Sequence, residues 1–312
     1  MAPKFTSLEI CAGAGGQAIG LERAGFSHVA LVEFDSDCCA TLKLNRPNWD
    51  VFHQDVRSFS GKKYAGKISL LAGGVPCPPF SVAGKQLGKE DDRDLFPEAI
   101  RLVREIKPDA VMLENVRGLL APPFVDYRKS IERDLKKLGY ESQWKLINAS
   151  EFGVSQLRPR VVLVAMKPEK MAKFKWPTPK KKKPPTVGCL LLDLMKSNGW
   201  EGAEKWAEKA NQIAPTLVGG SKKHGGPDLG PTRARKKWAE LAVDGLGLAN
   251  ESPAKGFIGN PKITVRMAAR VQGFPDKWAL FGKKTTSYRQ VGNAFPPAVA
   301  EAVAKQIAKA LR

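Results

Sequence analysis

The fold of this 312-residue chain is constrained most by the alternation of short apolar runs with helix-like stretches over residues 5–165. Strands are predicted at Phe5–Ile10, Val29–Val32, Val51–His53, Ile68–Ala72, Ala110–Leu113 and Val161–Ala165. Helices are predicted between them, at Asp37–Leu44, Phe96–Ile106, Tyr127–Leu138 and in a stretch that ends at Ala24. This alternation is typical of an α/β domain built on a parallel sheet.

Candidate functional residues follow five of the predicted strands. They are the glycine loop Ala12–Gly16, Glu33, Asp55, Cys77 and Glu114. Because the carboxyl ends of parallel strands share one edge of a sheet, we expect these five positions to converge on a single cleft.

Cys77 lies in the loop Gly73–Ser81, directly after a predicted buried strand. Pro76, Pro78 and Pro79 each fix a φ angle, so the loop holds the thiol with little loss of conformational freedom. Such rigidity suits a nucleophile that must meet a bound substrate. Taken alone, however, a cysteine in this setting is also compatible with a buried structural role.

The glycine loop has the pattern Gly13-x-Gly15-x-x-Ala18, with Glu33 about twenty residues further on. This pattern indicates a dinucleotide-type site in which an acidic side chain holds ribose hydroxyls, and it fits NAD and adenosine-based cofactors alike. Asp55 is placed to accept a hydrogen bond from an adenine amino group.

Glu114 is expected beside a buried strand end, where desolvation raises the pKa of a carboxyl group and lets it donate a proton near neutrality. Arg158 and Arg160 are two residues apart on an extended segment and are predicted to point to one side of it. Paired guanidinium donors could hold a phosphate or a carbonyl oxygen, although such a pair is also common as plain surface charge.

The second half of the chain is basic. The net charge is +20, of which residues 1–166 contribute +3 (23 basic, 20 acidic) and residues 167–312 contribute +17 (28 basic, 11 acidic). Such an asymmetry indicates a polyanionic partner, and nucleic acid is favoured over an anionic membrane. Five cysteines without a CxxC pair and three scattered histidines indicate reduced thiols and no metal site. No signal peptide or membrane-spanning run is recognised in the sequence.

The lysine run Lys180–Lys183 between prolines reads as an exposed linker to a less regular domain. Helices are predicted there and beyond at Val187–Lys196, Glu201–Ala210, Thr232–Ala242, Thr264–Gln272 and Pro297–Leu311, with a glycine-containing turn at Gln290–Ala294. Thr264 is the expected N-cap of its helix and Gly273 the expected end.

Six short motifs occur in order: Glu9–Gly16, Pro76–Ser81, Glu114–Val116, Gln156-x-Arg158-x-Arg160, Arg266–Gly273 and Gln290-x-Gly292-Asn293. Together they resemble the DNA (cytosine-5) methyltransferase family, in its bacterial restriction-modification form. The resemblance covers residues 5–166 and 262–311. It implies a Rossmann-like sheet that uses S-adenosylmethionine and releases S-adenosylhomocysteine, with a smaller, irregular, basic target-recognition domain.

The resemblance also implies residue roles. Cys77 would attack C6 of a cytosine flipped out of the duplex, Glu114 would bond ring N3, and Arg160, with Arg158 assisting, would bond the base carbonyl. The implied cofactor residues are Ile10, Cys11, Ala12, Gly13, Gly15, Gly16, Glu33, Phe34, Asp55, Val56, Pro76, Asn293 and Ala294. Within the matched motifs, Ser81 and Gln156 are the expected DNA contacts. Outside them, Lys180 and Lys181 are expected to contact phosphates as part of the lysine run, and Arg233 and Arg235 to read a base edge, although contact with phosphate alone is an equal alternative for either arginine. Cys11 departs from the family, which has an aromatic residue there, and Pro78 replaces a common glutamine.

The expected organisation is a catalytic and cofactor domain at 1–178, completed by 287–312, and a recognition domain with hinge at 179–286. The expected partners are double-stranded DNA and a separately encoded restriction endonuclease, for a monomeric, cytoplasmic, nucleoid-associated protein that binds no membrane. Three alternatives remain. They are a catalytically inactive DNA-binding relative, a same-fold methyltransferase acting on tRNA, and an NAD-dependent oxidoreductase.

Overall fold

The computed structural model of the chain describes residues 5–76, 94–219 and 228–312, which form two compact units. Unit 1 comprises the chain up to Ile147, Pro159–Pro177 and Ala300–Arg312; unit 2 comprises Asn148–Arg158 and Thr178–Val299. Compared with the expected domain boundaries, residues 148–158 and 287–299 group with the second unit.

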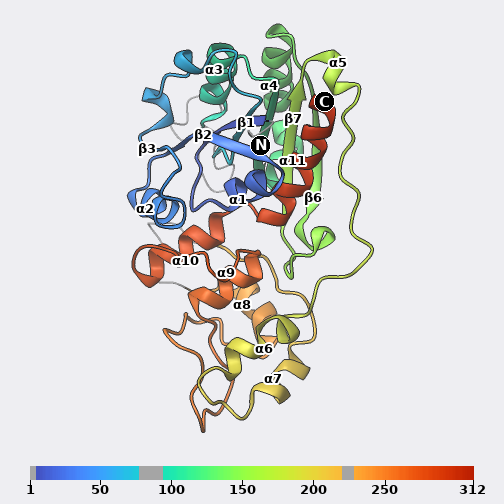
Figure 1. Cartoon of the computed structure of the whole chain (residues 1–312). Helices are drawn as coiled ribbons and strands as arrows, with labels where there is room; N and C mark the ends of the chain where they lie inside the picture. Colours follow the sequence, from blue (N-terminus) through green and yellow to red (C-terminus); the bar gives the residue numbers. More distant parts are fainter. Residues whose placement is uncertain (1–4, 77–93, 220–227) are drawn as a thin grey trace. The chain divides into compact units, whose positions relative to one another are not determined.

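Unit 1 is built on a seven-stranded sheet with the order β3-β2-β1-β4-β5-β7-β6 (Figure 1). Its strands are β1 (Phe5–Ile10), β2 (Phe26–Glu33), β3 (Val51–His53), β4 (Leu70–Gly73), β5 (Ala110–Val116), β6 (Glu141–Asn148) and β7 (Pro159–Met166). The first five strands in sequence pair in parallel, as the apolar alternation predicts. The expectation of an all-parallel sheet is wrong at one place, because β7 runs antiparallel to β5.

Strand β6 was not predicted, and its burial pattern explains why. It lies at the edge of the sheet, and only Ile147 among its eight residues is fully buried. An edge strand with polar side chains on both faces has no apolar run for sequence reasoning to detect.

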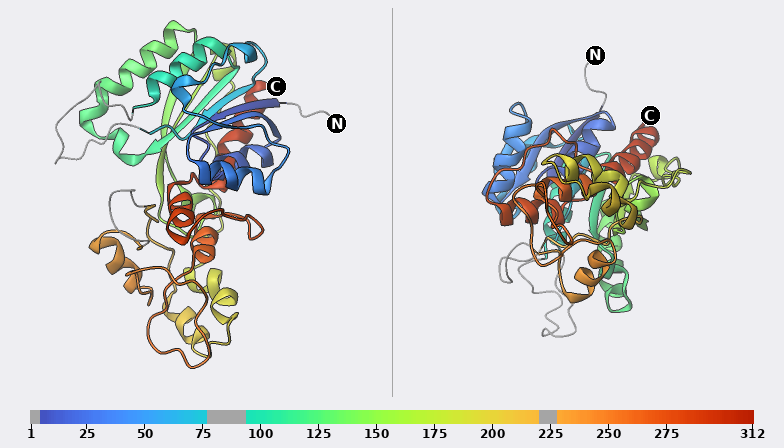
Figure 2. Two further views of the ribbon diagram at one scale, coloured as in Figure 1. Left: turned by 90° about the vertical axis from the view of Figure 1, so that its left-hand side faces the viewer. Right: turned by 90° about the horizontal axis from the view of Figure 1, so that it is seen from below.

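One face of the sheet is covered by α3 (Phe96–Ile106) and α4 (Val125–Lys137), whose apolar side chains form a buried cluster with Leu8 and Ile10. Helices α1 (Gly16–Arg23) and α11 (Pro297–Leu311) lie on the opposite face (Figure 2). The remaining helices of unit 1 are α2 (Ser36–Asn45) and α5 (Pro168–Met171).

The strand order reverses between β1 and β4, which lie side by side in register with Ile10 opposite Gly73. The glycine loop leaves the end of β1, and Gly74–Pro76 leaves the end of β4. Ligands of open α/β sheets bind where the order reverses, outside the carboxyl ends of the strands. A Cβ on Gly73 would lie 2.6 Å from Cγ1 of Ile10, so the two strand ends approach each other closely at this point.

Unit 2 is helical and irregular. Its helices are α6 (Val187–Lys196), α7 (Ala203–Lys209), α8 (Thr232–Ala239), α9 (Val265–Gln272) and α10 (Lys284–Asn293). Four tryptophans, Trp200, Trp206, Trp238 and Trp278, are buried in it. The indole N–H of Trp206 donates to the carbonyl of Ala242 at 3.1 Å.

Two helix ends of unit 2 bear on the sequence predictions. Helix α9 has Thr264 as its N-cap, whose hydroxyl accepts from the N–H of Met267, and it ends at Gly273 with φ +90°, as predicted. The turn expected at Gln290–Ala294 is instead the last turn of α10, which ends at Asn293. Helix α10 is not recognised in the sequence because its two threonines and its glycine have low helix propensity and most of its other residues are polar.

Candidate active site

Glu33, at the end of β2, organises the glycine loop. Its Oε2 accepts a hydrogen bond from the N–H of Gly13 at 2.7 Å, and its Oε1 accepts from Phe34 and Asp35 at 2.8 Å each. Burial raises the pKa of this carboxyl group, and the three backbone donors only partly oppose that effect. Gly13 and Gly15 have φ of +54° and +87°, a left-handed conformation that favours glycine.

The residues around the loop fit an adenosine-type cofactor. A Cβ on Gly13 would meet no atom within 4 Å, so the backbone is open to close approach by a ligand. Phe34 follows Glu33 directly and exposes 64% of its surface, which offers an aromatic face for a purine. Ile10 and Val56 belong to the core behind the loop.

Glu9 is a further feature of this region that the sequence reasoning left without a role. Its side chain is 1% exposed, and neither carboxyl oxygen has a hydrogen-bond partner among the described residues. Burial, together with the nearby charge of Glu33, raises the pKa of Glu9 well above its ordinary value. Because buried polar groups in proteins almost always have a hydrogen-bond partner, the carboxyl group of Glu9 is suited to bind a polar group of a ligand.

Two predicted cofactor residues have notable local geometry. Cys11 adopts φ +51°, an unusual conformation for a residue with a side chain, and burial raises the pKa of its thiol. Asp55 caps the turn that follows β3 and binds the guanidinium of Arg57 at 2.7 Å, which lowers the pKa of the Asp55 carboxyl group.

Glu114 and Arg160 form an ion pair in unit 1, with 2.7 Å between Oε1 and Nε. The register pairs Glu114 with Val162 and Val116 with Arg160, so the two side chains are diagonal neighbours on one face of the antiparallel pair. Glu114 therefore lies inside β5 rather than past its end, and it is only 7% exposed. The positive charge of Arg160 offsets the cost of burying the carboxylate.

Asn115, next to Glu114, holds the chain that leads to Cys77. Its amide donates to the carbonyl of Val75 at 2.8 Å, and its carbonyl oxygen accepts from the N–H of Val116. A Cβ on Gly74 would lie 3.3 Å from Oε2 of Glu114, so the chain passes close to that carboxylate. Pro76 ends this described stretch; Cys77 and Ser81 lie outside the described residues.

Arg158 belongs to unit 2 and has partners quite different from those of Arg160. It is fully buried, and its guanidinium donates to the carbonyls of Leu217 (2.8 Å), Gly292 (2.6 Å) and Ala294 (3.0 Å). The two guanidinium groups therefore have separate partners: backbone carbonyls of unit 2 hold Arg158, whereas Arg160 pairs with Glu114.

Gln156 takes part in the same buried network. Its amide donates to Oε1 of Gln272 at 2.6 Å, and its carbonyl oxygen accepts from the N–H of Leu217 at 2.8 Å. Gln272 in turn donates to the carbonyl of Ala294 at 2.5 Å. Gln156 has no exposed surface, so this predicted DNA contact serves the interior of unit 2.

The turn that ends α10 carries Asn293 and Ala294, two predicted cofactor residues. It packs against the backbone of Gly219: a Cβ on Gly292 would lie 2.3 Å from the Cα of Gly219. The Arg158 network and this glycine contact together define where Asn293 stands within unit 2.

The remaining predicted DNA contacts lie on the surface of unit 2. Lys180 and Lys181 are exposed, and the N–H of Lys180 donates to the carbonyl of Glu151 at 2.8 Å. Arg233 and Arg235 lie on α8, where Arg233 is exposed and Arg235 is half-buried.

Residues 5–76, 94–219 and 228–312 contain no cluster of three or more His, Cys, Asp or Glu side chains able to hold a metal ion. Within the same ranges, no helix has the length and apolar character needed to cross a membrane.

The fold and the site define a class of protein. A sheet whose order reverses beside a glycine loop anchored by a buried acid is the frame of a Rossmann-like methyltransferase that uses S-adenosylmethionine. A prophage-encoded DNA modification methyltransferase of Escherichia coli has this fold, with a TM-score of 0.71 and 24% identity over 99% of both chains.

Sequence comparison narrows the class to one family. The family described as C-5 cytosine-specific DNA methylase matches residues 5–309. The type II methyltransferase M.NgoMIV of Neisseria gonorrhoeae is 60% identical over 99% of both sequences. The type II methyltransferase M.NaeI of Lentzea aerocolonigenes is 56% identical over 97% of this chain and 75% of its own length. The chain belongs to the C-5 cytosine-specific DNA methylase family.

The protein is accordingly an enzyme that methylates C5 of cytosine in DNA with S-adenosylmethionine. This confirms the prediction made from the six motifs, and DNA is better supported than tRNA as the substrate. The oxidoreductase and the inactive relative are the alternatives set aside.

Proposed function

We propose that this enzyme is the methyltransferase of a type II restriction-modification system and that Cys77 is its nucleophile. Support for the first part comes from the type II relatives at 60% and 56% identity, each matched over almost the whole of this chain. A separately encoded endonuclease would then cut the same sequence when it is unmethylated. We propose that the enzyme acts as a monomer in the cytoplasm, on nucleoid DNA.

The assignment of Cys77 as the nucleophile rests on the contacts that two residues of β5 make with the chain just before Cys77. Asn115 binds the carbonyl of Val75, and the carboxylate of Glu114 lies beside Gly74. Residues 75 and 76 immediately precede Cys77, so β5 positions the start of its loop relative to the Glu114–Arg160 pair.

In the proposed reaction, the Cys77 thiolate adds to C6 of a flipped cytosine, and the ring electrons move to make C5 nucleophilic. Glu114 bonds ring N3, and Arg160 bonds the base carbonyl as negative charge develops there. The cofactor supplies the methyl group that C5 takes. A solvent water acting as base then takes the C5 proton, the electrons of that C–H bond re-form the C5–C6 double bond, and the bond from C6 to sulfur breaks to release the Cys77 thiolate.

The cofactor would be held by the glycine loop and its neighbours. Gly13, Gly15 and Gly16 offer close backbone approach, with Ile10, Cys11 and Ala12 as the strand end beneath them. Glu33 would hold the ribose hydroxyls, Phe34 and Val56 would contact the purine, and Asp55 would accept a hydrogen bond from the adenine amino group. Pro76, Asn293 and Ala294 complete the proposed set.

Unit 2 is proposed as the DNA-recognising part. The exposed lysines Lys180 and Lys181 contact phosphates, and arginines of α8 take part in sequence recognition. Ser81 is retained as a DNA contact from the Cys77 loop. Gln156 would affect DNA binding only indirectly, by holding Leu217 and Gln272 in the interior of unit 2.

The test is adduct formation with duplex DNA carrying 5-fluorocytosine, in which no proton can leave C5. We expect the wild type and a Cys189→Ser control, which changes an exposed free thiol of α6, to form a stable covalent complex. Cys77→Ser should bind S-adenosylmethionine normally and form none. An adduct with the Ser variant, or none with the wild type, contradicts the assignment. Resistance of host DNA to an endonuclease of matching specificity tests the type II role.

A further inference from the structure

Helix α8 concentrates positive charge on one exposed face. Four of the five residues 233–237 are arginine or lysine, and the helix carries no acidic residue. At 100° per residue, Arg233, Lys236 and Lys237 fall on one side, and these three are exposed. Trp238 has no exposed surface and anchors the opposite side in the core of unit 2.

Arg235 is set apart from the other three cations because it is already engaged. Its guanidinium binds Oδ2 of Asp228 and Oγ1 of Thr232, each at 3.2 Å. Asp228 also accepts from the N–H of Gly230 at 3.0 Å, so it joins the turn before α8 to the helix. A Cβ on Gly245 would meet Cγ of Arg235 at 3.1 Å, which shows how closely the stem of Arg235 packs on the neighbouring turn.

Arg233 and Lys236 are in the opposite situation. Neither side chain has a hydrogen-bond or ion-pair partner among the described residues. Lys237 pairs with Glu240 at 3.1 Å on the surface, a contact that contributes little to stability. The side chains of Arg233, Lys236 and Lys237 therefore face solvent. The opposite side of α8 is fixed in unit 2 by the buried Trp238.

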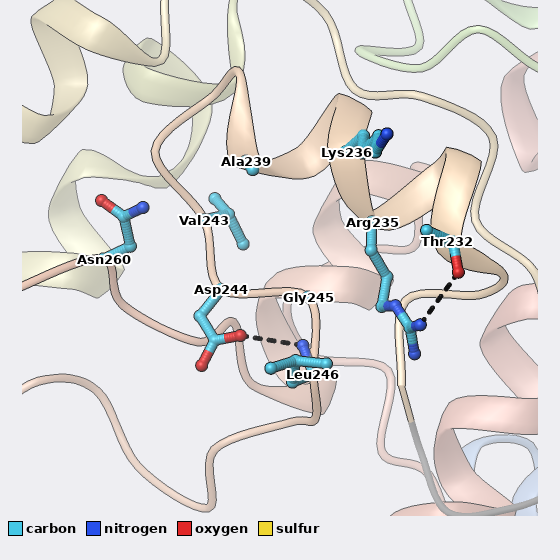
Figure 3. A pocket seen from close by; sticks show the side chains of 9 residues that line it. All are labelled: Thr232, Arg235, Lys236, Ala239, Val243, Asp244, Gly245, Leu246 and Asn260. Atoms are coloured by element: carbon cyan, nitrogen blue, oxygen red, sulfur yellow. Dashed lines mark hydrogen bonds between the residues drawn. The ribbon is translucent and has the colours of Figure 1, made fainter.

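A hollow of about 470 Å³ lies beside this face (Figure 3). Four residues of α8 border it, Thr232, Arg235, Lys236 and Ala239, and the rest of its wall is formed by Val243, Asp244, Gly245, Leu246 and Asn260. Leu246 is 70% exposed despite being apolar. The apolar atoms of Val243 and Leu246 beside Lys236 suit the sugar and methyl groups of DNA next to a phosphate, and the carboxylate of Asp244 is paired with Lys262 at 3.7 Å.

We propose that the exposed face of α8 lies in the major groove of the target duplex, with Arg233 reading a base edge and Lys236 and Lys237 holding phosphates. This rests on the proposed role of unit 2 in DNA recognition. An eight-residue helix is about 12 Å long, comparable to the width of the major groove. Arg233 can pair with both acceptors of a guanine, whereas Arg235 is a positioning residue that fixes the helix through Asp228.

The experiment compares Arg233→Gln, Lys236→Gln and Arg235→Gln with Lys205→Gln, which removes the same charge from an exposed position on α7. Each variant is assayed on a library of duplexes with randomised bases around the target cytosine, read by bisulfite sequencing. DNA affinity is measured at two salt concentrations, and thermal unfolding is followed in parallel.

We expect Arg233→Gln to reduce the preference at one base position about tenfold or more, with an unchanged melting temperature. Lys236→Gln should weaken binding to all sequences and lower the salt slope by about one unit. Arg235→Gln should lower the melting temperature, and Arg235→Lys should restore part of it. Lys205→Gln should change none of these.

The proposal fails if Arg233→Gln keeps the wild-type sequence preference, or if Lys205→Gln weakens binding as much as Lys236→Gln does. A relaxed preference in Arg235→Gln at wild-type stability would exchange the roles of the two arginines and also overturn it. These failures differ from a failure of the proposed function, in which the wild type itself would show no sequence preference on the library.

Discussion

Arg160 and Glu114 meet across the antiparallel pair β5–β7 at 2.7 Å, as diagonal neighbours on one face of the sheet. The contact exists only because β7 runs against β5, since this register brings residue 160 beside residue 116. Glu114, the acid proposed to bond the flipped cytosine, is thus buried and has the guanidinium of Arg160 as a fixed cation beside it. This relationship leads to the first prediction.

Glu114→Gln should reduce single-turnover methyl transfer by about a hundredfold or more, because a glutamine can donate to ring N3 but cannot deliver a proton. S-adenosylmethionine affinity should stay near that of the wild type. Glu98→Gln, an acid-to-amide change in another arginine pair of unit 1, is the matched control and should leave turnover unchanged. A Glu114→Gln variant with wild-type turnover would rule out the acid role.

Arg158→Met should destabilise unit 2 by about 3–5 kcal/mol, because it leaves two buried carbonyls, of Leu217 and Gly292, and the half-buried carbonyl of Ala294 without their charged donor. Urea unfolding followed by tryptophan fluorescence measures this, since four of the seven tryptophans, Trp200, Trp206, Trp238 and Trp278, lie in unit 2. Arg233→Met, on the surface of the same unit, should change stability by less than about 0.5 kcal/mol. Normal stability with lost turnover would instead make Arg158 a catalytic residue.

Gly292→Ala should be strongly destabilising, although its backbone is helical and alanine favours helices. The added methyl group would lie 2.3 Å from the Cα of Gly219, a backbone atom that cannot turn aside. Gly118→Ala, where a Cβ meets nothing within 4 Å, is the control and should be near neutral. Equal melting temperatures for the two variants would show that the 218–219 segment yields easily.

His28 should make unit 1 less stable in acid. Its ring is held between the Ser7 hydroxyl (2.9 Å) and the carbonyl of Ala18 (3.0 Å), and burial lowers its pKa from 6.5 to about 4. Because the unfolded chain binds the proton more readily, the stability due to neutral His28 is full above pH 6.5. It is lost as the pH falls towards 4.

Between pH 7 and pH 5 the wild type should therefore lose about 2 kcal/mol more than His28→Gln does. Urea titrations at the two pH values measure the difference. His53→Gln, at an exposed histidine of unit 1, is the control and should follow the wild type. Parallel losses in the wild type and His28→Gln would contradict the neutral, buried state of His28.

Neutralising Lys181, Lys182 and Lys183 together should weaken binding to every DNA sequence and reduce the salt slope by up to about three units. The methylated sequence should stay the same, since lysine–phosphate contacts carry no sequence information. Lys180 is left intact because its side chain packs near Gly153, where its Nζ lies 3.3 Å from the position that a Cβ would take. Methylome sequencing beside salt-dependent binding measures both effects, and an altered methylation site would refute the prediction.

Much of the fold follows from local sequence patterns. Strands Phe5–Ile10 and Val51–His53 and helices Phe96–Ile106, Val187–Lys196 and Pro297–Leu311 have their predicted bounds. Their apolar residues repeat with the period of one element over a short stretch, and glycines or prolines close the ends. The spacing of Gly13, Gly15 and Glu33 likewise predicts a contact that the structure contains, the bond from Gly13 to Glu33.

Only the tertiary structure determines which partner each of the two neighbouring arginines binds. Arg158 and Arg160 look equivalent in sequence, yet one binds carbonyls 59, 134 and 136 residues away while the other pairs with Glu114. In the same way, Arg235 is engaged by Asp228 and Arg233 is not, although they share one helix. Local sequence sets the backbone conformation and the residue types at each position. The partner of a charged side chain depends on which distant segments folding brings beside it, and no local pattern records that.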